Sequence, residues 1–410
     1  MSEPSWDVIV IGAGAAGLMA AMRAAERGKR TLLLEKNRKP GVKILMSGGT
    51  RCNITHATDN RGIVEAFGPP GRFLHSALAA LSVEDTVAFF EAEGVATKVE
   101  ETGKIFPVSN KATDLLAALL KRLQRSGATL ALDEPVLDVR RQDGRLTLTT
   151  PRRVLSAARV ILTSGGQSYP GCGTTGDGYQ WAQQFGHAIV QPRPALVPIT
   201  TSLPWVEALR GVTLPDVTVR ILDGGRSLAI RRGSLLFAHF GLSGPVVLDV
   251  SRFVTGHPRP ETLILEMDLL PGMSEEELTS HLKTESSASG KKQLASVLPA
   301  PLPRRVCEML LQVAGLPVDR KAAALSKEDR TRLVKCVKHL SIPITGTLGF
   351  KKAEVTAGGI VLDEVDSRTM QSKLMPELWI AGEILDLDGP IGGYNFQAAW
   401  STGRLAGSMV

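Results

Sequence analysis

DVIVIGAGAAG (residues 7–17) decides the fold of this chain. Residues 7–11 form an apolar run of the kind found in buried strands, and a helix-forming run follows from Ala15 to Arg27, closed by Gly28. A second strand-like run spans residues 31–35. Strand, helix and strand in this order predict a βαβ unit within an α/β fold built on a parallel sheet.

The turn between the first strand and the helix reads GAGAAG, a GxGxxG motif. Its first glycine permits a tight turn, its second lets the backbone approach a pyrophosphate, and its third allows close packing of helix on strand. An acidic residue ends the second strand, where it can bond ribose hydroxyls. We therefore predict a dinucleotide site rather than a purely structural turn. Its residues are Gly12, Gly14, Ala15, Ala16, Gly17, Glu35 and Lys36.

Length and composition limit the classes of protein to which this chain can belong. The 410 residues are enough for two or three structural units. The four cysteines lie far apart with no CxxC pair, which argues against a disulfide framework or a zinc site. The N-terminus lacks the basic region of a signal peptide, and no window holds about 20 unbroken apolar residues. We expect a soluble, cytoplasmic protein.

Changes in pattern along the chain predict its domains. We expect a first part of the dinucleotide-binding domain at residues 1–193, a β-rich domain at 194–272 and a helical insert at 273–341. Residues 342–356 should return through the β-rich domain, and residues 357–410 should rejoin the first.

The helical insert is strongly basic. Between Gly290 and Leu340 there are eleven Lys and Arg against four Asp and Glu, an excess of +7 that equals the excess of the whole chain. Such a surface can dock the phosphate backbone of RNA, although positive helical faces are often only solvated. We keep both interpretations open.

Two later segments favour FAD over NAD as the bound dinucleotide. RVILTSGG (159–166) and LWIAGEILDLDG (378–389) resemble the second and third cofactor-contacting signatures of glutathione-reductase-like flavoproteins. A second GxGxxG for NAD(P) is missing, so we expect non-covalent FAD and NAD(P)H as a transient electron donor. The residues assigned here are Ser164, Gly165, Gly166, Gly382 and Glu383.

A glycine-rich basic loop, PGVKILMSGGTRCN (40–53), follows the second strand. Its two cations can offset pyrophosphate charge, its serine and asparagine can form hydrogen bonds, and its double glycine lets the backbone pass the flavin edge. We assign to the cofactor Lys43, Ser47, Gly48, Gly49, Arg51, Cys52 and Asn53.

A second double glycine opens the last helix. The N–H groups of such a helix start can point at the flavin pyrimidine, where negative charge collects on reduction. The alternative is an ordinary helix cap. The residues concerned are Gly392, Gly393, Tyr394, Asn395 and Phe396.

Five segments together resemble a specific family. KILMSGGTRCNITH, TSGGQSYPGCGTTGDGY, LLFAHFGLSGPVVL, AEVTAGGI and AGEILDLDGPIGGYNFQAAW are similar to the BaiN/YhiN-type bacterial flavoproteins, and the resemblance spans nearly the whole chain. It implies a glutathione-reductase-like FAD domain with β-rich and helical insertions. It also places Val136, Asp177 and Tyr179 near the cofactor. One departure is visible, because similar sequences read SGGGRCN where this chain has Thr50.

Family members have been connected with reduction of uridine in ribosomal RNA to dihydrouridine, with steroid double-bond reduction and with amine oxidation. The leading interpretation is therefore NAD(P)H-driven reduction of an electron-poor C=C bond, with ribosomal RNA as the candidate substrate. The alternatives are an O2-dependent oxidase of a small amine and a non-catalytic, flavin-carrying RNA-binding protein.

Few side chains need be catalytic beside a flavin. Cys52 is a candidate proton donor because Arg51 beside it can shift its pKa, and the alternative is a buried thiol that packs the loop. His239 and Ser243 lie in FAHFGLSG, a turn that could cover the flavin, and Thr356 is placed near the flavin by the resemblance. No cluster has metal-ligand spacing, so no metal is assigned.

Overall fold

The computed structural model describes residues 5–410, and residues 1–4, where the predicted first domain begins, lie outside the described part. The chain folds as two compact units. The first unit contains the chain up to Pro194 together with Ala353–Val410, and the second contains Ala195–Lys352. Segments from the two ends of the sequence therefore share one unit.

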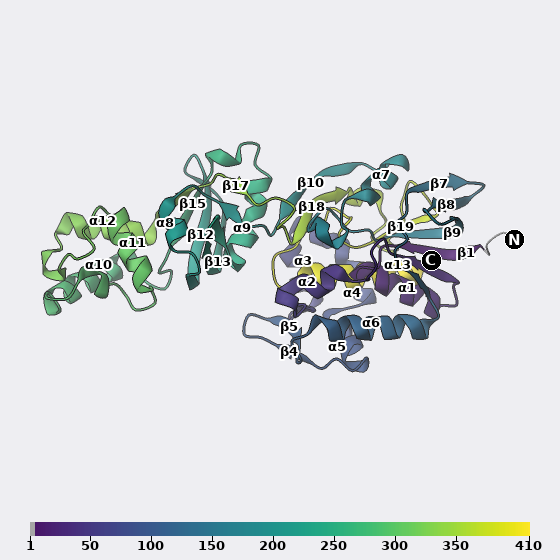
Figure 1. The fold of residues 1–410 in the computed structure, drawn as a ribbon, viewed down its shortest axis with the longest axis horizontal. Coiled ribbons are helices and arrows are strands. Elements are labelled where there is room, and N and C mark those ends of the chain that lie inside the picture. Colours follow the sequence, from purple (N-terminus) through teal and green to yellow (C-terminus); the bar gives the residue numbers. More distant parts are fainter. Residues whose placement is uncertain (1–4) are drawn as a thin grey trace. The chain divides into compact units, whose positions relative to one another are not determined.

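The first unit is built on a twisted mixed sheet (Figure 1). Its central strands are parallel and almost fully buried, as expected for strands covered on both faces. The predicted α/β class is confirmed. The strand order is β6 (Thr129–Ala131), β2 (Thr31–Leu34), β1 (Trp6–Ile11), β9 (Val154–Leu162), β8 (Arg145–Thr149) and β7 (Asp138–Gln142), with β19 (Leu378–Ile380) also paired to β9.

Helices α1 (Ala15–Glu26) and α13 (Tyr394–Met409) pack side by side against this sheet (Figure 1). They approach closely because glycines of α13 face the backbone of α1. A Cβ at Gly403 would overlap the carbonyl oxygen of Ala16, and one at Gly407 would overlap that of Ala20. The successive pairs run in the same direction along both helices, so the two helices are parallel.

The remaining elements surround this core. Strands β3, β5 and β4 form a small antiparallel sheet, and β10 pairs with β18. The bounds are α2 (Val42–Thr50), β3 (Thr55–His56), α3 (Asn60–Phe67), α4 (His75–Ala80), α5 (Val83–Ala92), β4 (Thr97–Val99), β5 (Lys104–Pro107), α6 (Ala112–Ser126), α7 (Asp177–Gln184), β10 (Ile189–Ala195) and β18 (Val355–Ile360).

Within residues 5–410, no single helix combines the length and apolar character needed to cross a membrane. One bent pair, Pro69–Ala80 with Val83–Ala92, meets the two criteria together.

The second unit contains an antiparallel sheet of seven strands. One prediction is corrected here: GPVVLDVS, expected to be β-rich, lies mostly in helix α9 (Pro245–Thr255), because Pro245 suits a first helical turn and the apolar residues cover one helix face. The strand order is β16 (Leu340–Pro343), β15 (Ile264–Asp268), β12 (Thr213–Asp223), β13 (Arg226–Ala238), β14 (Gly241–Ser243), β11 (Ile199–Thr200) and β17 (Gly346–Thr347).

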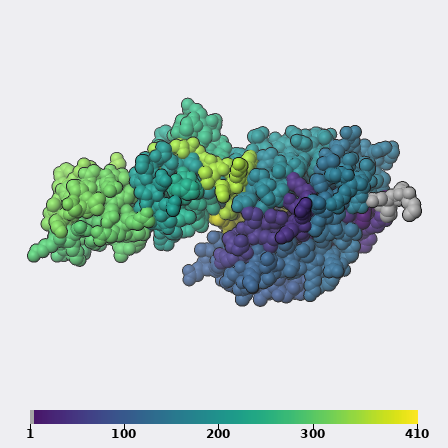
Figure 2. All heavy atoms as spheres, viewed as in Figure 1, coloured from purple at the N-terminus to yellow at the C-terminus, as the bar shows by residue number. Residues whose placement is uncertain are grey.

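The same unit contains three helices, α10 (Glu275–Ala288), α11 (Arg304–Val313) and α12 (Lys327–Lys338), whose atoms are light green in Figure 2. Helices α10 and α11 pack on α12, and α12 contacts strands β15 and β16. A single hydrophobic cluster includes side chains of the helices and side chains of the strands. The helical part and the sheet therefore share one core.

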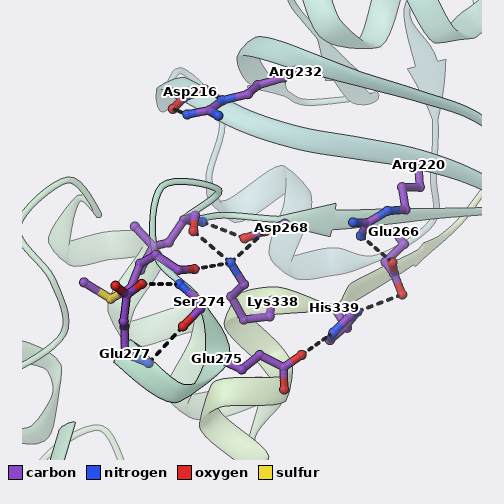
Figure 3. A network of polar contacts seen from close by, with 12 residues as sticks. Asp216, Arg220, Arg232, Glu266, Asp268, Ser274, Glu275, Glu277, Lys338 and His339 are labelled. Atoms are coloured by element: carbon purple, nitrogen blue, oxygen red, sulfur yellow. Dashed lines mark hydrogen bonds and ion pairs between the residues drawn. The ribbon is translucent and has the colours of Figure 1, made fainter. Parts of the chain in front are cut away.

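A buried ion pair fixes the helices to the sheet (Figure 3). The ammonium of Lys338 lies 2.8 Å from a carboxylate oxygen of Asp268 and donates to the carbonyl oxygens of Leu270 and Met273. His339 beside it bridges strand and helix through two carboxylates. Lys338 counted toward the basic excess of the insert, but its charge is balanced inside the protein.

We predict that Lys338→Met lowers the free energy of unfolding by about 3–5 kcal/mol, because it leaves the Asp268 carboxylate and two carbonyls buried without their partner. Urea denaturation measures the change. Lys335→Met, on the exposed face of the same helix, is the control and should change stability by less than about 0.5 kcal/mol. Equal effects of the two substitutions would contradict the buried role of Lys338.

Candidate functional site

The GxGxxG turn leaves an open face in front of helix α1. Gly12 has a φ of +100°, and a Cβ there would lie 2.7 Å from the carbonyl oxygen of Thr163, so the turn requires glycine. A Cβ at Gly17 would overlap the carbonyl oxygen of Gly12, whereas at Gly14 nothing lies within 4 Å. Because α1 has no side-chain cap, its first N–H groups face this open space and can bind an anion.

Glu35 ties the end of β2 to this turn. Its carboxylate is buried and accepts hydrogen bonds from the backbone N–H of Ala13 and of Asn37, both at 2.8 Å. Each oxygen keeps a second lone pair for a hydroxyl. The segment at residues 134–136 also meets the end of β2. The N–H of Glu134 donates to the Glu35 carbonyl oxygen, and buried Val136 follows two residues later.

Lys36 is paired with residues at the start of α7. Its ammonium contacts the Thr175 hydroxyl at 2.6 Å and the Asp177 carboxylate at 2.5 Å, at the start of α7. Two residues assigned separately to the cofactor, Lys36 and Asp177, are thus partners of each other.

Glu383 is the centre of a polar cluster formed by four distant segments. One of its oxygens accepts from the Thr356 N–H at 2.8 Å and from the Ser168 hydroxyl at 2.6 Å, and the other pairs with Lys43. The Thr356 hydroxyl oxygen accepts from the N–H groups of Gln167 and Ser168. This cluster fixes the turn after β9, which contains Ser164, Gly165 and Gly166, against β18 and α2.

The two cations of the 40–53 loop have carboxylate partners in the structure. Lys43 pairs with Glu383, and Arg51 lies 2.7 Å from Glu100 with its guanidinium stacked 4.0 Å above the Phe106 ring. Their charges are balanced by the protein, so the expectation that they offset pyrophosphate charge gains no support here.

The start of α13 meets strand β3 at the other end of the site. Gly393 has a φ of +97°, and a Cβ there would lie 2.5 Å from the backbone of Thr55. Tyr394 stacks on His56, whose Nδ1 lies 3.0 Å from the Gly392 carbonyl oxygen. The Asn395 side chain instead closes the preceding loop through Gly389, and the Phe396 ring stacks on Trp400.

Several buried polar atoms in this unit have no hydrogen-bond partner in the described chain. Asn53 Oδ1, Thr55 Oγ1, Ser164 Oγ and the Tyr179 hydroxyl are examples. Burial raises the pKa of Tyr179 and keeps the phenol neutral. Such atoms are costly unless a ligand satisfies them. Together with two helix starts that have no side-chain cap, they fit a cofactor that carries phosphate at one end and a polar ring at the other.

Sequence reasoning missed two side chains of this region. Ser168 follows the double glycine by two residues and joins the Glu383 cluster, and His56 follows the glycine-rich loop and contacts the start of α13. Both stand inside the segments that carried the family resemblance, but their partners are hundreds of residues away in sequence.

A family model described as the HI0933-like protein Rossmann domain matches residues 6–409. The chain belongs to this family. It is 34% identical over 400 residues to the "Ribosomal RNA dihydrouridine synthase" of Escherichia coli K12, covering 97% of this chain and 96% of the relative. It is 29% identical over 401 residues to the "3-dehydro-bile acid delta(4,6)-reductase" of Clostridium scindens, covering 97% of each.

Among solved structures, the 3-ketosteroid-delta4-(5alpha)-dehydrogenase of Rhodococcus jostii RHA1 matches with a TM-score of 0.51 at 16% identity, covering 99% of this chain and 97% of that one. This likeness concerns the fold alone. The predicted resemblance to the BaiN/YhiN-type family is confirmed. The chain is a flavoprotein oxidoreductase with a Rossmann-type FAD-binding domain.

Residues 42–50 of the glycine-rich segment were expected to form a loop. They form an interrupted helix, α2. The interruption comes from Ser47, Gly48 and Gly49, whose dihedral angles are not helical. Thr50 continues the run of positive φ values with a φ of +70°. The family resemblance leads us to expect a third glycine at this position, and a β-branched residue is strained there.

The catalytic role predicted for Cys52 is not supported by its surroundings. The side chain is fully buried, and burial raises the pKa of Cys52 to about 12, more than the hydrogen bond with Ser47 lowers it. Arg51, expected to act on the thiol, is engaged by Glu100. The geometry favours the packing alternative, in which this thiol fills the loop.

The other catalytic candidates differ in their surroundings. Thr356 is fully buried, and its hydroxyl and N–H groups hold the turn at residues 167–168 and Glu383. His239 is exposed in the two-residue turn between β13 and β14, and Ser243 ends β14. Both belong to the second unit, and their roles stay predictions.

We predict that Thr50→Gly stabilises the protein by about 0.5–1 kcal/mol, because relief of backbone strain exceeds the added entropy of the unfolded chain. Thr113→Gly, at an exposed position in the first turn of α6, is the matched control and should destabilise by up to about 1 kcal/mol. Thermal denaturation of both variants measures the difference. A loss of stability in Thr50→Gly equal to that of the control would show that the position carries no strain.

Proposed function

We propose that this chain reduces an electron-poor C=C bond with FAD as cofactor and NAD(P)H as electron donor, and that uridine in ribosomal RNA is its substrate. The observation that carries the proposal is the 34% identity, across 97% of the chain, with a relative named for dihydrouridine synthesis in ribosomal RNA. The second relative is named as a reductase, which supports reduction of the substrate rather than its oxidation.

Different residues of the site would bind different parts of FAD. The open face at Gly14 and the first N–H groups of α1 would hold the pyrophosphate, and Glu35 would bond the ribose hydroxyls. The start of α13 and Asn53 would contact the ring that carries negative charge after reduction. Bound FAD would supply hydride transfer between donor and substrate.

The chain must also supply a proton. Saturation of uracil adds a hydride at C6 and a proton at C5, so uridine, NAD(P)H and one proton give dihydrouridine and NAD(P)+. We propose that His239 supplies the proton, since its imidazole is exposed to solvent. The Cys52 thiol is enclosed by the protein and is a poorer candidate.

Anaerobic stopped-flow absorbance tests the proposal. The yellow protein is mixed with NADPH or NADH and then with protein-free ribosomal RNA that lacks the modification. We expect bleaching of the flavin band followed by RNA-dependent reoxidation, with dihydrouridine in the RNA by mass spectrometry.

His239→Asn tests the assignment of the proton donor. It should slow RNA-dependent reoxidation of the flavin by at least about 10²-fold and leave the rate of bleaching by the nicotinamide unchanged. If an unsaturated ketone reoxidises the bleached flavin and RNA does not, the substrate is a small unsaturated compound rather than RNA. Failure of both nicotinamides to bleach the flavin would contradict the reductase and favour oxidation of a small amine.

A further inference from the structure

A short backbone pairing gathers lysines at one place in the helical part of the second unit. Gln293 forms an antiparallel bridge with Lys321, the Ala322 N–H donates to the Lys292 carbonyl oxygen at 2.9 Å, and the Leu294 N–H donates to that of Arg320 at 2.8 Å. Lys291 and Lys292 therefore lie beside Lys321, although about thirty residues of chain separate them. We call Lys291, Lys292 and Lys321 the lysine cluster.

The charges of the lysine cluster are not balanced locally. All three side chains are exposed, and none makes an ion pair within residues 5–410. No acidic residue occurs in residues 289–294 or 320–324. Arg304 lies next to the cluster, where its guanidinium donates to the Gln293 side chain at 3.0 Å, but its charge is paired with Glu308. An anionic partner can neutralise these exposed charges.

Three other basic residues of the insert have carboxylate partners. Arg320 and Arg332 both pair with Asp329, and Lys338 is buried against Asp268. The lysine cluster differs from the lysines of α12 in that a backbone bridge brings its members together from two segments of the chain.

We propose that the lysine cluster docks the phosphate backbone of RNA. The inference rests on the proposed function, since it takes RNA as the substrate. Residues 273–341 contain no Phe, Trp or Tyr, so this surface offers no ring on which a base can stack. It contacts phosphates and positions the RNA without reading its sequence. Counterion release then makes the affinity depend on salt.

The test compares two triple variants of the full-length holoprotein that lose the same charge. The first is Lys291→Gln, Lys292→Gln and Lys321→Gln. The control is Lys283→Gln, Lys327→Gln and Lys335→Gln, three exposed lysines of the same helical part that lie outside the cluster. Binding of protein-free ribosomal RNA is measured by fluorescence anisotropy at several KCl concentrations, and thermal denaturation verifies folding.

We expect the cluster variant to bind RNA at least about tenfold more weakly, with a salt slope reduced by roughly 1 for each lysine, while the control keeps wild-type binding. Equal binding by the two variants, or equal losses in both, would overturn the assignment of this surface. Reduction of the flavin by NAD(P)H should be unchanged in both. If wild type binds RNA through the cluster but RNA does not reoxidise the flavin, the proposed function fails while the docking surface stands.

Discussion

The close contact between α1 and α13 is the constraint on which the site depends. Gly403 and Gly407 leave no room for side chains, so the last helix lies directly on the backbone of the first at Ala16 and Ala20. Because the two helices are parallel, the glycine turns that precede them both belong to the edge where parallel strands end. A cofactor site can therefore be assembled from the two ends of the chain although the whole second unit lies between them in sequence.

The two units differ in whether their basic side chains have carboxylate partners. Near the predicted cofactor the cations are neutralised by the protein itself, with Lys43 on Glu383 and Arg51 on Glu100, and helix starts are left to attract the phosphates. In the second unit Lys338 is buried and paired, whereas the three lysines of the cluster are exposed and make no ion pair within residues 5–410. The first arrangement suits a small cofactor held by backbone dipoles, and the second suits a long polyanion held by surface charge.

Local patterns in the sequence predicted the local structure well. The strand, turn and helix over residues 7–28 appear as expected, because burial and glycine geometry act there over a few residues. The helix α2 was missed because Gly48 and Gly49 interrupt it, and α9 was missed because its β-branched residues suit strands as well. The partners of Lys43 and Lys338 depend on contacts across 340 and 70 residues, which no local pattern specifies.

Identification and titration of the bound flavin test the central claim most directly. The flavin is released from the purified chain by heat and identified by chromatography, and the apoprotein of the wild type and of Glu35→Ala is titrated with FAD. We predict one FAD per chain and an affinity at least about tenfold weaker in the variant, because the ribose and the Gly12–Gly14 turn lose their shared carboxylate. Release of FMN, absence of flavin, or unchanged FAD affinity in Glu35→Ala would contradict the site described for the first unit.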